Sequence, residues 1–429
     1  MLRRFIEQIV SSALATVIAL FVAASLLAGC GSTVAARGIE TGSQQVSEYL
    51  PLLKGKRVCV LSNQTGMVTP KTHVLDTLLS SGVDVVCIMS PEHGFRGDAD
   101  AGEKVASGVD SKTGIPIRSL YDGDMGRPSA ETMQSFDVLV FDLQDVGCRF
   151  YTYITTMAKM MESCARYGRK MVILDRPNPW GFKVDGPILD TASLRSGVGY
   201  LPIPILHGMT LGEMAGMIDG EHWLPDSLQG TFAAIDEVPT DTLTADFTVI
   251  KCKNYTHDSL YRLPVKPSPN LPDMRSIYLY PSLCYFEGTV LSLGRGTDTP
   301  FQMYGHPAME ASFTFTPTSR PGAKTPPLQD ELCYGVDLRT SPPTDSLLAR
   351  GIDLRYVIDA YRRLGTDLSG NFVANGASTP FFRHFFDLLT GQAYVREMIE
   401  AGASAAEIRA RWQSDVEKFA ARRRPYLLY

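Results

Sequence analysis

The sequence predicts an α/β protein built on a Rossmann-like, doubly wound parallel sheet, with a second, smaller α+β domain at the C-terminal end. Short continuous runs rich in Val, Ile and Leu occur four times in the first half, at residues 58–61, 83–89, 138–141 and 171–174. Such runs are typical of strands covered on both faces, and the amphipathic segments between them suit helical crossovers. This alternation of strands and helices predicts a doubly wound sheet.

One crossover helix is well marked between the third and fourth runs. Apolar residues recur there at helical spacing, at Ile154, Met157, Met161 and Cys164. Gly168 is placed to end this helix.

The second half of the chain is less regular, because Pro and Gly become frequent after Gly186. A proline-rich segment, residues 265–272, is predicted to be extended and lies between the halves. The clearest later element is the last helix, where Ser404 and Glu407 are expected to form a capping box and Pro425 lies beyond the end. The apolar face of that helix consists of Ile408, Trp412, Val416 and Phe419.

The composition is that of a soluble globular protein. The chain has 429 residues, of which 44% are hydrophobic and 20% charged, and this length suits two cores rather than one. The formal net charge is −5, and Lys and Arg are scattered apart from the run at 422–424. Since binding to a phosphate backbone requires a basic surface, no nucleic acid is expected as a partner.

The first thirty residues predict an export signal. Arg3 and Arg4 precede an almost unbroken apolar stretch at 9–28. Such a stretch is long enough for a transmembrane anchor, but its ending, Leu-Ala-Gly-Cys, resembles a bacterial lipoprotein cleavage box. We therefore expect lipidation of Cys30 and a protein anchored by its lipid to a bacterial cell membrane, facing the periplasm or the exterior. The expected organisation is a signal peptide over 1–30, a tether over 31–50, one domain over 51–240 and a second over 241–429.

The other cysteines do not suggest a disulfide framework or a zinc site. Without Cys30, seven of the eight cysteines remain, which is an odd number, and no close pairs occur in the sequence. Cys59 and Cys87 lie inside apolar, strand-like runs. They are interpreted as small buried hydrophobic residues.

Each predicted strand is followed by a polar segment rich in turn residues. These segments are residues 62–66, 91–97, 142–151 and 175–179. Ligands of doubly wound sheets bind beyond the carboxyl ends of the strands, so the four segments predict one binding site. None contains a Gly-x-Gly-x-x-Gly or Walker motif, and no cofactor is expected.

Glu92 is the first candidate for acid chemistry. Pro91 before it and Gly94 after it let the backbone turn tightly against a ligand. A carboxyl group at the end of a buried strand can have its pKa raised by desolvation, as a general acid requires. The alternative is that Glu92 caps a helix or pairs with Arg96. His93 either orients a carboxylate or a substrate hydroxyl, or is structural.

Two aspartates, Asp142 and Asp145, follow the third predicted strand. Arg149 is near enough in sequence to pair with either, so a structural ion pair, with Asp145 as a helix N-cap, is an equal alternative to a catalytic role. Asp175 and Arg176 repeat the arrangement one strand later. The four strand-end acids are more than capping requires.

A metal site is another possible use of these acids. Glu92, His93, Asp142 and Asp145 are oxygen and nitrogen donors that could converge. No paired-histidine motif is present and His207 stands alone, so no metal is expected. The absence of Gly-x-Ser-x-Gly also argues against a serine hydrolase.

Seven segments in order resemble those of the exo-β-N-acetylmuramidase family. Each is weakly specific by itself, but the set is specific, and the resemblance extends from about residue 55 to about residue 305 and, more loosely, to the C-terminus. The segments are residues 62–66, 91–97, 142–153, 175–179, 207–211, 267–272 and 286–297.

Members of that family are glycoside hydrolases that remove N-acetylmuramic acid from the non-reducing ends of peptidoglycan fragments. Their active site lies between a Rossmann-like domain and a smaller C-terminal domain. The resemblance therefore implies a peptidoglycan-derived disaccharide or muropeptide as partner and Glu92 as the catalytic acid. Glycosidic cleavage also needs a group that attacks or stabilises the oxocarbenium-like centre. The candidates are Asp142, Asp145, Tyr151 and the substrate's own acetamido group.

The lactyl carboxylate distinguishes N-acetylmuramic acid from N-acetylglucosamine, and a planar guanidinium suits a carboxylate. Arg149, Arg176 and Arg295 are the candidates, with at least one expected within reach of Glu92. The other residues expected to bind substrate are Asn63, His93, Asn178, His207, Asn270 and Glu287.

Three positions depart from the family pattern. Cys148 replaces an expected alanine, and Gln302 replaces an expected acid. Residues 306–308 are His-Pro-Ala instead of Ala-Pro-Trp, which removes an aromatic ring that a sugar could stack on. Two rival functions fit the same residues: a metal-dependent hydrolase of another cell-wall bond, such as an amidase, and a non-catalytic muropeptide-binding lipoprotein.

Overall fold

The computed structural model describes residues 38–91, 95, 108–120, 126–224, 243–365, 371–374 and 377–429. The export signal, Cys30, Glu92 and His93 lie outside these residues. Among the described residues, no helix combines the length and the apolar character that crossing a bilayer requires.

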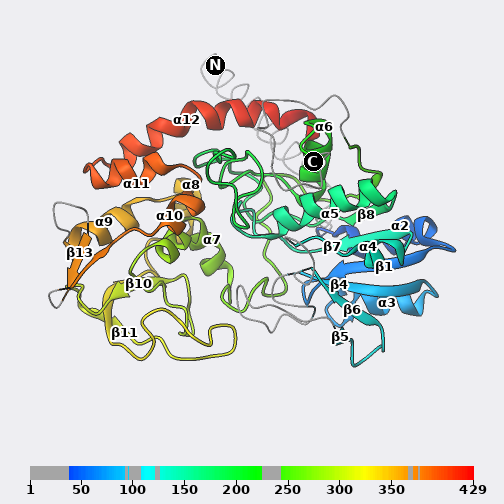
Figure 1. Ribbon diagram of the computed structural model, residues 1–429, viewed down its shortest axis with the longest axis horizontal. Coiled ribbons are helices and arrows are strands. Elements are labelled where there is room, and N and C mark those ends of the chain that lie inside the picture. Colours follow the sequence, from blue (N-terminus) through cyan, green and yellow to red (C-terminus); the bar gives the residue numbers. More distant parts are fainter. Residues whose placement is uncertain are drawn as a thin grey trace, which may run out of the picture. The chain divides into compact units, whose positions relative to one another are not determined.

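A seven-stranded sheet is the centre of the N-terminal half, in the order β5-β6-β4-β1-β7-β8-β9 (Figure 1). All neighbouring strands are parallel except β5, which pairs antiparallel with β6 at one edge. The strands are β1 (Arg57–Ser62), β4 (Asp84–Ser90), β5 (Gly108–Val109), β6 (Pro116–Ser119), β7 (Val138–Asp142), β8 (Lys170–Leu174) and β9 (Phe247–Ile250). The four predicted strands are thus confirmed as β1, β4, β7 and β8.

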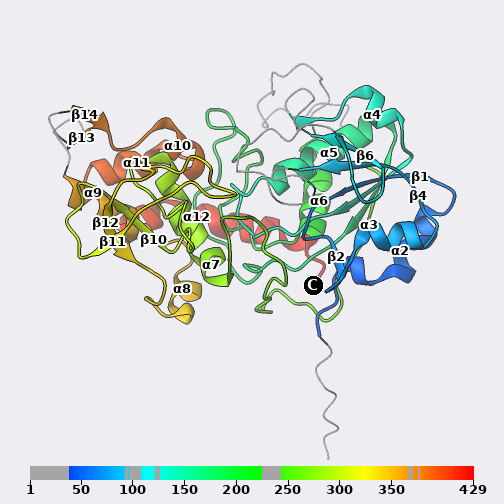
Figure 2. The same ribbon diagram turned by 90° about the horizontal axis from the view of Figure 1, so that it is seen from below.

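Helices cover both faces of this sheet (Figure 2), which confirms the doubly wound arrangement. Along β1, Val58 and Val60 pack on one face, whereas Cys59 and Leu61 pack on the other. The first face is covered by α2 (Val46–Leu53) and α3 (Val74–Ser80), and the second by α4 (Ala130–Gln134), α5 (Tyr153–Tyr167) and α6 (Leu211–Gly220). Because both faces are buried, the strands read as continuous apolar runs.

The predicted crossover helix is α5. It ends at Gly168, whose left-handed φ of 60° suits a residue without a Cβ atom. The helix begins at Tyr153, after Thr152. The alternative reading of Asp145 as the N-cap of this helix is therefore wrong.

The C-terminal half combines helices with small antiparallel sheets, which confirms the α+β prediction. Its helices are α7 (Met274–Leu283), α8 (Thr344–Arg350), α9 (Arg355–Leu364), α10 (His384–Thr390), α11 (Ala393–Glu400) and α12 (Ala405–Arg422). Its strands are β10 (Met303–His306), β11 (Phe313–Phe315) and β12 (Cys333–Asp337), in the order β10-β12-β11, and the pair β13 (Asn371–Ala374) and β14 (Ala377–Pro380). A short hairpin of β2 (Met67–Thr69) and β3 (Thr72–His73) and the 3-10 turns η1 (Gly42–Gln44), η3 (Cys284–Gly288) and η4 (Arg424–Tyr426) complete the elements.

The last helix, α12, has the predicted capping box, in which Ser404 and Glu407 bond each other's backbone N–H groups. Its four predicted apolar residues are buried. The helix runs from α11 to α6 (Figure 1). Near the start of the helix, Arg409 pairs with Asp185 at 2.7 Å. At its end, Arg422 pairs with Glu221, the residue after α6. Helix α12 therefore links the N-terminal and C-terminal halves of the chain through an ion pair near each of its ends.

Two of the predicted boundaries differ from the observed elements. β9 belongs to the same sheet as β8, so the N-terminal sheet extends beyond the expected boundary at residue 240. Within the expected tether, Glu40 pairs with Lys253, and α2 begins at Val46. Tyr49 of α2 is fully buried beneath the sheet. Burial of this ring explains why α2 belongs to the fold although the polar composition predicted a tether there.

Candidate active site

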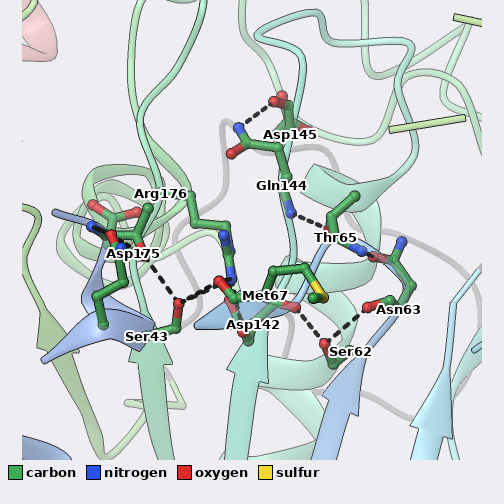
Figure 3. A network of polar contacts seen from close by, with 12 residues as sticks. Ser43, Ser62, Asn63, Thr65, Met67, Asp142, Gln144, Asp145, Asp175 and Arg176 are labelled. Atoms are coloured by element: carbon green, nitrogen blue, oxygen red, sulfur yellow. Dashed lines mark hydrogen bonds and ion pairs between the residues drawn. The ribbon is translucent and has the colours of Figure 1, made fainter. Parts of the chain in front are cut away.

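The segments that follow β1, β7 and β8 lie at one edge of the sheet, as predicted (Figure 3). β1 and β7 are in parallel register up to the pair Ser62 and Asp142, where both strands end. β4, which precedes Glu92, is the other direct neighbour of β1 and ends at Ser90. The carboxyl ends of parallel strands meet at one edge, which is the usual ligand site of this architecture.

Asp142 is held by Arg176, the arginine of the neighbouring strand end. The Nε atom of Arg176 donates to Oδ1 of Asp142 at 2.5 Å, and its Nη2 atom donates to Oδ2 at 3.0 Å. Nη2 also donates to Ser43 (Figure 3), and both charged side chains are buried. The structural reading of Asp142 as an ion-pair partner is supported, but its partner is Arg176 and not Arg149.

Arg149 instead binds backbone carbonyl groups of both halves of the chain. Its guanidinium is buried and donates hydrogen bonds of 2.8–3.0 Å to four backbone carbonyl oxygens, those of Pro187, Ile203, Leu389 and Thr390. Burial lowers its pKa to about 10. With both terminal nitrogens engaged, Arg149 is placed to position loops rather than to bind a substrate carboxylate.

Asp145 lies apart from the Asp142–Arg176 pair, beside Gln144 (Figure 3). Its Oδ1 atom accepts a hydrogen bond of 2.6 Å from the N–H of Gly147. Its Oδ2 atom is buried and has no hydrogen-bond partner among the described residues. Burial raises the pKa of Asp145 to about 7. The carboxyl group therefore keeps its proton close to neutral pH, but its free oxygen is shielded from solvent.

Asn63 and Asn178 are buried and shape the loops that carry them. Oδ1 of Asn63 accepts from the N–H of Thr65 at 2.9 Å. Oδ1 of Asn178 accepts from the N–H of Trp180 at 2.7 Å, and its Nδ2 donates to the carbonyl of Met209 at 2.8 Å. Both amides thus fix backbone conformation.

His207 is also buried. Burial lowers its pKa to about 3, with a smaller contribution from Arg423. The ring is therefore neutral, its Nδ1 accepts from the N–H of Met209 at 3.2 Å, and its Nε2 has no partner among the described residues. His207 belongs to the loop before α6.

A pocket of about 300 Å³ brings together four of the residues expected at the site: Tyr151, Asn270, Glu287 and Arg295. Its wall also holds several aromatic rings that the sequence did not single out, namely Phe150, Tyr280, Phe301 and Phe385. Phe150 and Phe301 lie in loops, and Tyr280 and Phe385 lie near the ends of α7 and α10, where no periodic pattern marks them. The only sequence signal that could have identified these residues is their aromatic character, together with the nearby segments that resemble the family.

Glu287 and Arg295 form an ion pair at this pocket. Nε and Nη2 of Arg295 donate to Oε1 of Glu287 at 3.0 and 2.5 Å. Burial lowers the pKa of Arg295, but Glu287 outweighs it and the pKa is raised above its ordinary value. The guanidinium lies 5.1 Å from the ring centre of Phe301. No described residue contacts Nη1 of Arg295 or Oε2 of Glu287 through a hydrogen bond, so both atoms can meet a ligand.

The pocket is joined to the edge of the sheet through Pro267. Its carbonyl accepts from the hydroxyl of Tyr151 at 2.8 Å and from Nε2 of Gln64 at 3.2 Å. Gln64 belongs to the segment after β1, and Ser268, Asn270 and Leu271, which follow Pro267, line the pocket. Asn270 is fixed there by its Nδ2, which donates to the carbonyl of Gly322 at 2.7 Å.

Phe95, three residues after Glu92, approaches the same loops. Phe95 packs edge-on against His73, with ring centres 5.3 Å apart. Nε2 of His73 lies 2.7 Å from the carbonyl oxygen of Asn63. Phe95 therefore lies beside the segment after β1.

The departures from the family pattern lie outside the pocket wall. Gln302 donates to both carboxylate oxygens of Asp273 at 3.0 Å, and Asp273 caps α7. His306 packs edge-on against Phe372, with ring centres 4.8 Å apart. Aromatic rings from other positions line the pocket, so an aromatic surface is present without a tryptophan at 308.

Within the described residues, no three His, Cys, Asp or Glu side chains are grouped as a metal site. Two of the four donors considered above, Glu92 and His93, lie outside those residues.

Comparisons with known proteins agree with this architecture. The family models described as "Exo-beta-N-acetylmuramidase NamZ, N-terminal" and "Exo-beta-N-acetylmuramidase NamZ, C-terminal" match residues 58–275 and 278–429. The peptidoglycan beta-N-acetylmuramidase NamZ of Bacillus subtilis is 35% identical in an alignment of 410 residues that covers 91% of this chain and 91% of that protein. Two solved structures of DUF1343 family proteins from Bacteroides fragilis are also similar. One has a TM-score of 0.78 at 51% identity and the other 0.73 at 27%, and each comparison covers 91% of this chain and 99% of the other. The chain belongs to the NamZ exo-β-N-acetylmuramidase family.

Proposed function

We propose that this protein is an exo-acting β-N-acetylmuramidase that hydrolyses terminal non-reducing N-acetylmuramic acid from peptidoglycan fragments. The observation that carries the proposal is the pocket in which Tyr151, Asn270, Glu287 and Arg295 meet. It belongs to a chain that matches the NamZ family over nearly its whole length.

The size and lining of the pocket suit one terminal sugar. Its volume of about 300 Å³ lies at the lower end of the range for small-molecule sites. Aromatic rings provide apolar surface for the C–H face of a pyranose, and polar groups of Asn270, Glu287 and Arg295 suit its hydroxyl, acetamido and lactyl groups. A pocket that holds one sugar favours cleavage at chain ends.

Arg295 is the preferred ligand of the lactyl carboxylate. The guanidinium groups of Arg149 and Arg176 are buried and engaged by carbonyl groups and by Asp142, whereas Arg295 lines the pocket and has Nη1 free of described partners. Glu287 fixes the orientation of Arg295. A fixed, planar cation is suited to a carboxylate.

Glu92 is assigned the role of general acid. It follows β4, the direct neighbour of β1, and the segment after β1 contacts the pocket wall through Gln64 and Pro267. For the second catalytic role, Asp142 is engaged by Arg176 and the free oxygen of Asp145 is buried. Tyr151, which lines the pocket, and the acetamido group of the substrate are the remaining candidates.

Turnover of matched substrates tests the proposal. The full chain, solubilised in detergent, should hydrolyse a chromogenic β-N-acetylmuramide and leave the corresponding glucosaminide nearly untouched. Glu92→Gln should lower kcat by about 100-fold or more, as expected for loss of a general acid, and should retain binding. Glu397→Gln, at a largely exposed glutamate, is the matched control.

The rival functions give different results in the same assay. A metal-dependent hydrolase should lose activity with a chelator, whereas the proposed acid mechanism should not. A protein that binds muropeptides without any turnover would contradict the enzymatic proposal.

The export of the protein is part of the proposal. The Leu-Ala-Gly-Cys sequence at 27–30 supports attachment of lipid to Cys30. A Cys30→Ser variant should lose metabolic labelling by a fatty acid and leave the membrane fraction. Unchanged labelling of that variant would exclude Cys30 as the lipidation site.

A further inference from the structure

Two cysteines that stand far apart in the sequence meet in the centre of the sheet. Cys59 of β1 and Cys87 of β4 are direct partners in the parallel register of the two strands. Their Sγ atoms lie 2.8 Å apart, and both side chains are buried. Both also point to the same face of the sheet, the one covered by α4 and α5.

The backbone places these residues where a disulfide can form. Neighbouring strands lie about 4.8 Å apart, within the range of about 4.4–6.8 Å that Cα atoms of disulfide-linked cysteines span. The observed sulfur separation is shorter than van der Waals contact between two sulfur atoms and longer than the covalent bond of about 2.05 Å. Closing the bond requires the two sulfur atoms to approach each other by about 0.8 Å.

We propose that Cys59 and Cys87 form a disulfide that links β1 to β4. The reaction is an exchange with a disulfide oxidant, such as an oxidised thiol-disulfide oxidoreductase or oxidised glutathione. One cysteine thiolate attacks the oxidant and releases one of its sulfurs as a thiol. The second cysteine then displaces the other sulfur, so two cysteine thiols lose two protons and two electrons and the oxidant becomes two thiols.

In the folded protein the pKa values of the two thiols are shifted in opposite directions. A hydrogen bond with Cys59 lowers the pKa of Cys87, and a hydrogen bond with Ser135 adds to this effect. Burial raises the pKa of Cys59 well above its ordinary value. Because both thiols are covered in the folded protein, the exchange takes place before the helices close over the sheet.

The position of the link connects it with the edge of the sheet described above. Cys59 lies three residues before Ser62, where β1 ends, and Cys87 lies three residues before Ser90, where β4 ends. The link therefore fixes the two strands that precede Asn63 and Glu92. The inference does not depend on the proposed enzymatic activity, but it agrees with the expected export, since disulfides persist in oxidising compartments.

Peptide mapping of the full chain tests the link without any variant. The protein is isolated from cells in which it is exported, denatured in an alkylating agent that traps free thiols, and digested with trypsin. The tryptic peptides 58–71 and 72–96 should be recovered joined, two hydrogen atoms lighter than their sum, and should separate on reduction. Recovery of both peptides separately, each carrying the alkyl group, would overturn the proposal.

Thermal unfolding of protein that has been unfolded and refolded with or without a reductant gives a second test. Reduction should lower the unfolding temperature of the unmodified sequence by several degrees. It should have the same effect on Cys333→Ala, which removes a buried cysteine of β12, and no effect on the Cys59→Ala, Cys87→Ala double variant. No shift in the unmodified sequence would contradict the link. If the double variant does not fold, the peptide map decides.

Discussion

The guanidinium group of Arg149 donates a hydrogen bond of 2.8 Å to the carbonyl oxygen of Thr390, which lies 241 residues further along the chain. It also binds the neighbouring carbonyl of Leu389, and both Leu389 and Phe150, the residue after Arg149, line the pocket. Arg149 therefore holds two segments of the pocket wall together. A residue that the sequence suggested for substrate recognition has a positioning role.

Replacing Arg149 with Met should destabilise the protein by about 3 kcal/mol or more, because buried carbonyl groups lose their donor and each such loss costs about 1–3 kcal/mol. Urea unfolding monitored by circular dichroism measures this. Arg339→Met, which removes a largely exposed arginine paired with Asp337, should cost less than about 1 kcal/mol. Equal losses in the two variants would contradict the assignment.

The buried pair of Asp142 and Arg176 predicts strong coupling between two mutations. Asp142→Asn and Arg176→Met should each cost about 3–5 kcal/mol, because each leaves a buried charge without its partner. The double variant should cost clearly less than the sum. Additive losses in a double-mutant cycle would show that the two groups do not depend on each other.

The sheet was predictable because burial on both faces produces continuous apolar strands, and α5 and α12 were predictable because each has one buried face and a recognisable end. β9 was missed because its burial is partial and gives no such run. The expected boundary at residue 240 therefore falls before the last strand of the sheet.

The site was less predictable from local pattern than the sheet. Sequence proximity favoured Arg149 as the partner of Asp142, whereas the strand order brings Arg176 to it. Asn270, Glu287 and Arg295 were found through the family resemblance, since nothing in their local spacing shows that they meet Tyr151. Both the partner of Asp142 and the residues that meet Tyr151 are determined by contacts between segments far apart in the sequence.

Asp145 makes the stability of the protein depend on pH. The carboxyl group titrates near pH 4 in the unfolded chain and, because burial raises its pKa, near pH 7 in the folded protein. Between these values the folded state binds more protons, so its contribution to stability falls as the pH rises. The loss is at most about 4 kcal/mol.

Asp145→Asn should remove this contribution, since an amide keeps the oxygen that accepts from Gly147 and carries no charge. The variant should match the unmodified protein near pH 4 and exceed it in stability at pH 8. Denaturant titrations at the two pH values measure the difference. Asp175, whose pKa burial raises to about 6, still contributes in both proteins and cancels in the comparison. A variant that is less stable than the unmodified protein at pH 8 would contradict the prediction.

Arg295 should determine the preference for muramyl over glucosaminyl substrates. A lysine keeps the positive charge but loses the planar geometry that binds Glu287 through two nitrogens while a third faces the pocket. Hydrogen bonds to charged groups contribute about 1.5–3 kcal/mol, so Arg295→Lys should lower kcat/KM for the muramide by about 10- to 100-fold. Turnover of the glucosaminide, which has no lactyl carboxylate, should change little. Arg339→Lys, at an arginine outside the pocket wall, is the matched control and should leave both substrates unaffected. A preference that stays the same in Arg295→Lys would mean that another group recognises the lactyl carboxylate.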